Sequence, residues 1–304
     1  MKNIIVSGAS GFIGKALVKR MLQEGNRVCA IVTSKEKMQD VKSDLLTVVT
    51  ADFSTYLQLP SLIEKDVYDC FYHLAWTGYG KTTNDYTVQL ENVKATCDAV
   101  KVASAIGCKR IVFASSFSEY MIPDGSDISH NDNGVCNVYG ATKESARLMA
   151  QAVAYQNNIS MVSVAFSNTF GPGDYSRRTP NLFLSKFMQG QDVDLTPGDA
   201  LYEWTYIDDS VEGLICAAEK GKDNGIYYIG SNNVRPLKDI VGEIRDLISP
   251  ESKINLGKYK ENFKCDYNSI DTFRLTKDTG YQPKCEFKNA ILSTVAWLKE
   301  IDFK

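Results

Sequence analysis

Two side chains that could act together on a proton, Tyr139 and Lys143, stand four residues apart in a stretch that predicts a helix over 139–156. That spacing places both on one face of the helix. A lysine ammonium beside a phenol stabilises the phenolate and lowers the pKa of the tyrosine towards the working pH. Ser115 and Ser116 end a predicted strand, where open α/β sheets place their sites, so a serine hydroxyl could bond the same reacting oxygen. These residues indicate proton transfer to or from an alcohol.

A second candidate site is the glycine pattern Gly8-x-x-Gly11-x-x-Gly14, which follows a predicted strand and opens a predicted helix. Glycines allow a tight turn, let a pyrophosphate approach the backbone, and let the helix pack closely on the strand. The helix N-terminus adds unpaired N–H groups and partial positive charge. In that context the pattern predicts a dinucleotide site. The expected contacts are Gly8, Ser10, Gly11, Phe12, Ile13 and Gly14.

The end of the second predicted strand, 27–33, should distinguish the two nicotinamide cofactors. An acidic residue there would bond the ribose 2′-hydroxyl, whereas a cation suits a 2′-phosphate. At the end of this strand no acidic residue follows Val32 before Glu36, so the pattern favours NADP(H), with NAD(H) as the alternative. The lysines nearby could equally be solvated surface charges. We expect cofactor contacts from this corner and from the end of the third strand, at Thr33, Ser34, Lys35, Asp52 and Phe53.

Short β-branched runs alternate with longer amphipathic stretches through the first 170 residues, as parallel sheets joined by helices require. The predicted strands are 4–7, 27–33, 46–50, 69–75, 110–115 and 160–166, and the predicted helices are 15–23, 83–106 and 139–156. The sequence therefore predicts an α/β fold, a Rossmann-type doubly wound parallel sheet covered on both faces.

The alternation stops after the segment Gly171-Pro172-Gly173-Asp174. We expect a dinucleotide-binding Rossmann domain over 1–170 and a smaller substrate-binding part over 171–304, with a strand near 225–229 returning to the main sheet.

Composition excludes several classes of protein. With 304 residues, 44% of them hydrophobic and 23% charged, the chain is unlike disordered, collagen-like or coiled-coil sequences. A net charge of −3 argues against nucleic acid as a partner. No stretch reaches the ~20 apolar residues of a membrane helix. No targeting segment precedes the first strand, so we expect no membrane partner and a cytoplasmic location.

The eight cysteines include no C-x-x-C pair, and the chain has two histidines, His73 and His130, so we predict no metal site. His73 lies in a predicted strand and is expected to be a core residue. Most cysteines fall in predicted elements, where they behave as small apolar side chains: Cys29, Cys70, Cys97, Cys108 and Cys216. Cys136, three residues before Tyr139, is expected near the pocket.

Together, the glycine turn, Ala114-Ser115-Ser116, Tyr139-x-x-x-Lys143 and Ser167-Asn168-Thr169-Phe170-Gly171-Pro172 resemble the extended short-chain dehydrogenase/reductases. The similarity is to the nucleotide-sugar epimerase/dehydratase/reductase family and covers essentially the whole chain. It implies a catalytic triad of Ser116, Tyr139 and Lys143, in which Lys143 also holds the nicotinamide ribose. It further implies cofactor contacts at Leu74, Ala75, Trp76 and Asn92, and a sugar or diphosphate contact at Asn168. It also implies a homodimer built on helices 83–106 and 139–156.

The chain departs from this family next to the triad. Family 4,6-dehydratases carry Asp-Glu after the catalytic hydroxyl residue, whereas this chain has Phe117-Ser118, so we expect no dehydration. The arginine that commonly binds the diphosphate is replaced by Tyr202, and we expect Arg235, with Arg177 or Arg178, to substitute for it. Loop 76–80 follows a strand and could line the substrate pocket, although its aromatic residues could equally cover an edge of the core. The expected substrate contacts include Trp76, Ser116 and Phe117.

These features predict an NAD(P)-dependent oxidoreductase that acts on a nucleotide-activated sugar. We expect reduction of a 4-keto sugar with NADPH, in which Tyr139 donates the proton, Ser116 orients the carbonyl oxygen and Lys143 tunes the tyrosine. A 4-epimerase with retained NAD is the alternative. A non-catalytic nucleotide-sensing relative is the alternative from another functional class.

Overall fold

A parallel β-sheet forms the centre of the molecule in the computed structural model, which describes residues 2–121, 138–261 and 265–303. Within these residues the sheet has seven strands in the order β11-β6-β5-β4-β1-β2-β3. The strands are β1 (Asn3–Ser7), β2 (Arg27–Val32), β3 (Leu46–Thr50), β4 (Cys70–His73), β5 (Arg110–Ser116), β6 (Ser160–Phe166) and β11 (Ile226–Ile229). The predicted doubly wound sheet is confirmed.

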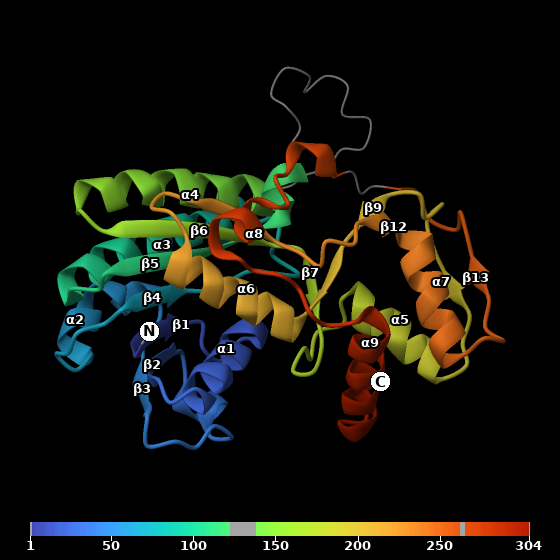
Figure 1. Ribbon diagram of the computed structural model, residues 1–304, viewed down its shortest axis with the longest axis horizontal. Coiled ribbons are helices and arrows are strands. Elements are labelled where there is room, and N and C mark those ends of the chain that lie inside the picture. The colour runs from blue at the N-terminus through green and yellow to red at the C-terminus, as the bar shows by residue number, and fades with distance from the viewer. Residues whose placement is uncertain (1, 122–137, 262–264, 304) are drawn as a thin grey trace.

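Helices cover both faces of the sheet, because alternate residues of each strand point to opposite sides. On one face Ile4 and Val6 of β1 pack with α1 (Phe12–Gln23) and α6 (Ile207–Lys220). On the other face Ile5 packs in a core shared with α3 (Tyr86–Ile106) and α4 (Val138–Gln156). Figure 1 shows these two layers on either side of the strands. A short helix, α2 (Leu59–Leu62), lies beside α3.

The strand order reverses at β1, which pairs with β2 on one side and with β4 on the other. Ser7 lies opposite His73 at the end of this pairing, so the turn after β1 and the segment after β4 leave the sheet together. In open α/β sheets a ligand crevice forms at such a switch point, outside the carboxyl ends of the strands. The glycine turn stands at this place.

A separate core holds the C-terminal part, which lies beside the carboxyl ends of the strands in Figure 1. Its buried residues include Phe170, Trp204, Ile240 and Ile291. Its helices are α5 (Thr179–Met188), α7 (Leu237–Ile248) and α9 (Phe287–Glu300). Helix α8 (Arg274–Thr279) packs instead against α6 and β11, with Leu275 in the same core as Ile4. Short strand pairs join β7 (Asn168–Phe170) to β10 (Trp204–Tyr206), β9 (Leu201–Tyr202) to β12 (Arg235–Pro236), and β8 (Val193–Asp194) to β13 (Ile254–Asn255).

Element boundaries differ from the sequence predictions mainly near the crevice. The third helix begins at Tyr86 rather than at residue 83, because the Asp85 side chain caps it by accepting a hydrogen bond from the Thr87 N–H at 3.0 Å. The strand predicted over 69–75 ends at His73, and Leu74 to Thr77 continue as a loop. That loop forms part of the crevice wall.

The predicted core role of His73 agrees with its surroundings. His73 is buried, and its ring nitrogens are hydrogen-bonded to the hydroxyls of Ser7 at 2.8 Å and Thr96 at 3.3 Å. Burial lowers the pKa of His73 to about 3, so the ring is neutral at physiological pH. Cys29, Cys70 and Cys108 are buried, while Cys97 and Cys216 are half-buried. His130 and Cys136 lie outside the described residues.

None of the described helices has the length and apolar character needed to cross a membrane. Across the described ranges, no cluster of three or more histidine, cysteine or acidic side chains is arranged to hold a metal ion.

Candidate functional site

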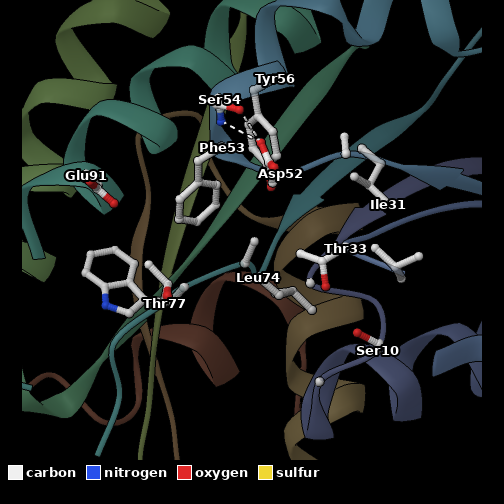
Figure 2. Close-up of a pocket in the computed structure, with 16 residues that line it drawn as sticks. Ser10, Ile31, Thr33, Asp52, Phe53, Ser54, Tyr56, Leu74, Thr77 and Glu91 are labelled. Carbon is white, nitrogen blue, oxygen red and sulfur yellow. Dashed lines mark hydrogen bonds between the residues drawn. The ribbon is translucent and has the colours of Figure 1, made fainter. Parts of the chain in front are cut away.

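A cavity of about 560 Å³ opens at the switch point of the sheet. The glycine turn forms one wall, and the ends of β2, β3 and β4 form the others. In Figure 2, Ser10 and Thr33 lie on one side of this space, and Phe53 and Glu91 lie on the other. Its lining comprises Gly8, Ser10, Gly11, Ile31, Val32, Thr33, Ala51, Asp52, Phe53, Ser54, Tyr56, Leu74, Ala75, Trp76, Thr77 and Glu91.

The glycine turn has the close contacts that a phosphate cradle requires. Gly8 has φ +70°, and a Cβ built there would lie 2.6 Å from the Ala75 nitrogen. A Cβ on Gly14 would lie 2.2 Å from the Gly8 carbonyl oxygen, so α1 can approach β1 this closely only with glycine at that position. The N-terminus of α1 points at the cavity with its partial positive charge. This part of the site fits the pyrophosphate of a dinucleotide.

The corner at the end of β2 agrees only in part with the sequence prediction. Thr33 lines the cavity, whereas Ser34 and Lys35 lie outside the set of lining residues. The Lys37 ammonium donates to the Thr33 hydroxyl at 3.0 Å, and the Ser34 hydroxyl donates to the Glu36 carboxylate. The corner therefore presents one hydroxyl to the cavity, and its nearby lysine is already hydrogen-bonded to that hydroxyl.

Asp52 and Phe53, expected as cofactor contacts, both line the first cavity just after β3. Asp52 caps the 3-10 helix Phe53–Gln58 by accepting a hydrogen bond from the Ser54 N–H at 2.9 Å. The Ser54 hydrogen bonds lower the pKa of Asp52. The Phe53 ring packs edge-on against Tyr56 with centroids 5.3 Å apart. This pair supplies an apolar face for a base beside a fixed carboxylate.

A second cavity, of about 390 Å³, adjoins the first and shares Gly8, Gly11, Leu74 and Trp76 with it. The predicted triad lines this space, with Ser116 at the end of β5 and with Tyr139 and Lys143 on α4. The Ser116 oxygen accepts a hydrogen bond from the Ser118 N–H at 3.2 Å, and Ser116 and Tyr139 line the same cavity. Phe12, Ile13, Phe117 and Asn168 also line it.

The Lys143 ammonium is buried among a carbonyl group and aromatic rings. It donates to the Ala114 carbonyl oxygen at 2.7 Å and lies 3.6 Å from the centroid of the Trp76 ring. Burial lowers the pKa of Lys143 to about 7, and the negative charge of Glu119 opposes this shift. Lys143 can therefore change its charge within the physiological range.

Burial raises the pKa of Tyr139, an effect opposed by its hydrogen bond with Ser116 and by the positive charge of Arg178. The phenol is thus the resting form, and a proton donor stands beside a serine hydroxyl and two cationic side chains. Such an arrangement can protonate or deprotonate an oxygen bound in the second cavity.

Arg178 is the one of the proposed arginine substitutes that lines the second cavity. It donates to the Asp174 carboxylate at 2.7 Å and to the Ser176 hydroxyl at 3.0 Å, and Tyr79 lines the same cavity. The Tyr79 ring packs edge-on against Tyr139 with centroids 5.3 Å apart. Tyr79 belongs to loop 76–80, which was expected to line the substrate pocket, and it lines this cavity. Asp174, which lines it too, was not among the predicted site residues.

Arg235 lines neither the first nor the second cavity. It pairs in the β9–β12 ladder with Tyr202, the residue that replaces the family arginine. Its guanidinium donates to the Glu243 carboxylate at 2.5 Å and stacks over Phe287, with its central carbon 4.7 Å from the ring centroid.

Asn168, in contrast, lines the second cavity and keeps a buried Nδ2 without a hydrogen-bond partner in the described part of the chain. That donor is available for a ligand.

Asn92 is buried in α3 and does not line either of these two cavities. Its side chain accepts a hydrogen bond from the Thr77 N–H at 2.7 Å and donates to the Thr77 carbonyl at 3.1 Å. Asn92 therefore fixes the loop after β4, whose residues Leu74, Ala75 and Trp76 do face the first cavity.

A buried ion pair lies behind the triad. The side chains of Glu119 and Arg147 are only 3% and 12% exposed, and their carboxylate oxygen and Nε are 3.1 Å apart. Arg147 follows Lys143 by one helical turn and Tyr139 by two, so all three lie on the same side of α4. The remaining Glu119 oxygen is buried and has no hydrogen-bond partner among the described residues.

Removing the cation of this pair should destabilise the fold. We expect Arg147→Met to cost about 3–5 kcal/mol at pH 8, because it leaves a buried carboxylate unpaired. Burial already raises the pKa of Glu119, and the variant would raise it further. The stability lost in the variant should therefore shrink as the pH falls towards about 4.3, the pKa of a glutamate in the unfolded chain. Urea unfolding at pH 8 and pH 5 measures both effects. Glu144→Gln is the matched control, since Glu144 is an exposed partner of Arg147 at 3.5 Å. A deficit that is independent of pH would contradict this interpretation.

A family model described as "NAD dependent epimerase/dehydratase family" matches residues 4–230, which hold the sheet, the glycine turn and the triad. The chain belongs to this family. The resemblance stated from the sequence motifs is thereby confirmed.

Among curated relatives, the chain is 24% identical over 327 residues to UDP-N-acetyl-alpha-D-glucosaminuronate decarboxylase of Bacillus cytotoxicus, with 99% of both proteins covered. Two solved structures share the fold. One is UDP-glucuronic acid 4-epimerase from Bacillus cereus in complex with UDP-glucuronic acid and NAD (TM-score 0.79, 19% identity, 98% of this chain and 99% of that chain). The other is UDP-glucose 4-epimerase from Thermotoga maritima with UDP-glucose (TM-score 0.79, 18% identity, 98% and 99%).

Proposed function

We propose that this member of the epimerase/dehydratase family transfers hydride between a nicotinamide cofactor and carbon 4 of a nucleotide-activated sugar. The observation that carries the proposal is the continuity of the two cavities. The glycine cradle and the side chains of Ser116, Tyr139 and Lys143 share a wall made by Gly8, Gly11, Leu74 and Trp76. A dinucleotide held by the cradle would therefore extend towards the proton-transfer residues.

Each triad residue has a role that follows from its surroundings. Tyr139 is protonated at rest and gives its proton to, or takes one from, the oxygen on carbon 4. The Ser116 hydroxyl, which lines the same cavity as Tyr139, orients that oxygen. Lys143 stabilises the phenolate while the proton is away. The bound nicotinamide supplies or accepts the hydride. Asn168 and Arg178 provide donors for the sugar or its diphosphate.

The arrangement of carboxylates argues against dehydration, which requires an acid and a base beside the sugar. Phe117 and Ser118 occupy the positions after Ser116. Asp174 is the carboxylate that lines the triad cavity in the described residues, and Arg178 engages it at 2.7 Å. Glu119 is paired with Arg147 behind the triad.

Two reactions use the same triad, 4-epimerisation with retained NAD(H) and reduction of a 4-keto sugar with exchanging NADP(H). We favour epimerisation, because the family is described as NAD dependent and both solved structures named above are 4-epimerases. Reduction with NADP(H), the first expectation from the sequence, remains the second candidate. It is supported by the absence of an acid at the end of β2, where Lys37 holds Thr33.

The test begins with the nucleotide carried by the purified protein, released by denaturation and identified by mass spectrometry. An epimerase should carry NAD and convert UDP-glucuronic acid or UDP-glucose to its 4-epimer with no net change at the absorbance band of reduced nicotinamide. A reductase should consume NADPH in proportion to an added 4-keto nucleotide sugar. If neither reaction occurs with any of these substrates, the proposed function is wrong and the non-catalytic alternative gains support.

The same preparation tests the expected homodimer. We propose that α3 and α4 pair with those of a second copy, because both helices expose large apolar side chains at Tyr86, Leu90, Leu148, Met149 and Tyr155. Light scattering should then give about twice the chain mass of 33.8 kDa, and a mass of one chain would reject the dimer.

A further inference from the structure

Trp76 is placed against the catalytic lysine in a way that the family resemblance did not imply. The Lys143 ammonium lies 3.6 Å from the centroid of the Trp76 ring, nearer than the rings of Phe113 at 5.2 Å and Tyr139 at 5.8 Å. The Trp76 ring also packs edge-on against Tyr139, with centroids 5.9 Å apart. One indole thus contacts both members of the Tyr-Lys pair.

Two buried amides on α3 hold this indole in position. The Trp76 Nε1–H donates to the Gln89 side-chain oxygen at 3.0 Å. The Gln89 amide nitrogen donates to the carbonyls of Gly78 and Thr82, both at 3.1 Å, and Asn92 fixes the adjacent Thr77. The indole is therefore bonded through its own Nε1, and the loop that follows it is bonded at Thr77, Gly78 and Thr82, which leaves the ring little freedom to turn away from Lys143.

The ammonium has few other partners. It donates one hydrogen bond, to the Ala114 carbonyl, and within the described residues no carboxylate lies within salt-bridge distance of it. A buried cation without a direct counter-ion is costly, and a face of tryptophan is the strongest aromatic partner for it. The indole therefore favours the charged form of Lys143, the form that stabilises the Tyr139 phenolate.

We propose that Trp76 is a positioning residue for catalysis, which holds the Lys143 ammonium charged and in place beneath Tyr139, and that Gln89 sets the orientation of its indole. The inference rests on the proposed function, since it assigns the means by which that same site keeps its lysine active.

Few charged or titratable groups face Lys143 apart from these. His73 faces it from β4 but is neutral across the physiological range, and Tyr139 faces it from α4 itself. Glu119 approaches it from the 3-10 helix Phe117–Met121 and is paired with Arg147, which follows on α4. Removing the indole would therefore change the protonation of Lys143 without removing a charged group from its surroundings.

The first experiment follows the charge of Lys143 directly and uses no substrate. The tryptophan emission of the protein is titrated from pH 5 to pH 9, and the Trp76→Phe signal is subtracted to isolate Trp76 from Trp204 and Trp297. We expect a transition with a midpoint near the Lys143 pKa of about 7, absent in Lys143→Met. A titration without that transition would overturn the proposal, whatever the enzyme's substrate proves to be.

The second experiment uses the pH profile of kcat/KM. Gln89→Leu releases the indole without altering a residue that lines either the dinucleotide or the triad cavity. In this variant we expect the alkaline limb of the kcat/KM profile to move to lower pH by about one unit, while the KM for the cofactor changes less than about twofold. Trp76→Leu should shift the limb at least as far, and Trp76→Phe should restore part of the shift.

Thr294→Val is the matched control, because Thr294 is also buried on a helix and its hydroxyl donates to the Ala290 carbonyl at 2.7 Å, far along the chain from the triad. It should leave the profile in place. A residue with a merely structural role would lower activity equally at all pH values. A uniform loss in Gln89→Leu and Trp76→Leu would therefore refute the proposal.

Discussion

Replacing Tyr139 with phenylalanine should lower kcat by about 10²–10⁴-fold, the range that positioned proton transfer contributes. The variant removes one hydroxyl and keeps the ring that packs against Trp76 and Tyr79. Because we propose that hydroxyl as the proton donor in the second cavity, the loss should appear in turnover. Binding of the dinucleotide, measured by calorimetry, should change little.

Tyr155→Phe provides the control for this change. Tyr155 lies on the same helix, α4, and is 84% exposed, so losing its hydroxyl should leave kcat unchanged. Turnover by Tyr139→Phe within about tenfold of the parent enzyme would be incompatible with an acid–base role for Tyr139.

Gly14→Ala should cost both stability and cofactor binding. The new Cβ would lie 2.2 Å from the Gly8 carbonyl oxygen and 2.9 Å from its carbon, and these are backbone atoms that cannot rotate away. Helix α1 would have to move from β1, at a cost of about 1–3 kcal/mol or more in the free energy of unfolding. The same movement should displace the N-terminus of α1 from the phosphate position, so dinucleotide affinity should fall as well.

Denaturant unfolding without cofactor and calorimetry with it measure the two losses separately. Gly242→Ala on α7 is the control, since a Cβ there meets no heavy atom within 4 Å. It should raise stability by about 0.5–1 kcal/mol through the higher helix propensity of alanine. A Gly14→Ala variant that binds the dinucleotide as tightly as the parent would show that close packing of α1 is not needed for the cradle.

The sheet and the cradle could be predicted because their signals are local. The glycine spacing needs only the strand before it and the helix after it, and Ile4 to Val6 lie between helices on both faces as their apolar run indicated. The meeting of Tyr139 and Lys143 was likewise a matter of helical spacing. The approach of Ser116 followed from the rule that parallel strands end at one edge.

The partners of these residues could be predicted only in part, because their contacts depend on segments without a regular pattern. Arg178, one of the arginines expected as substitutes, reaches the triad from the irregular chain after β7. Gln89 lies in the predicted helix, but it meets Trp76 only because the loop after β4 turns back towards α3. Asn92 was expected at the cofactor, but its side-chain bonds go to Thr77. A sequence alone does not show whether a buried amide faces a ligand or the loop beside it.

The return of the chain at β11 has a consequence for dividing this protein into fragments. β11 pairs with β6 along Ser163 to Phe166, a stretch buried on both faces. Without residues beyond 170, β6 would become the edge of the sheet and present unpaired backbone groups beside apolar side chains, which invites association with other chains. The segment beyond residue 170 thus also protects the main sheet from aggregation, so the two parts of the chain should be expressed together.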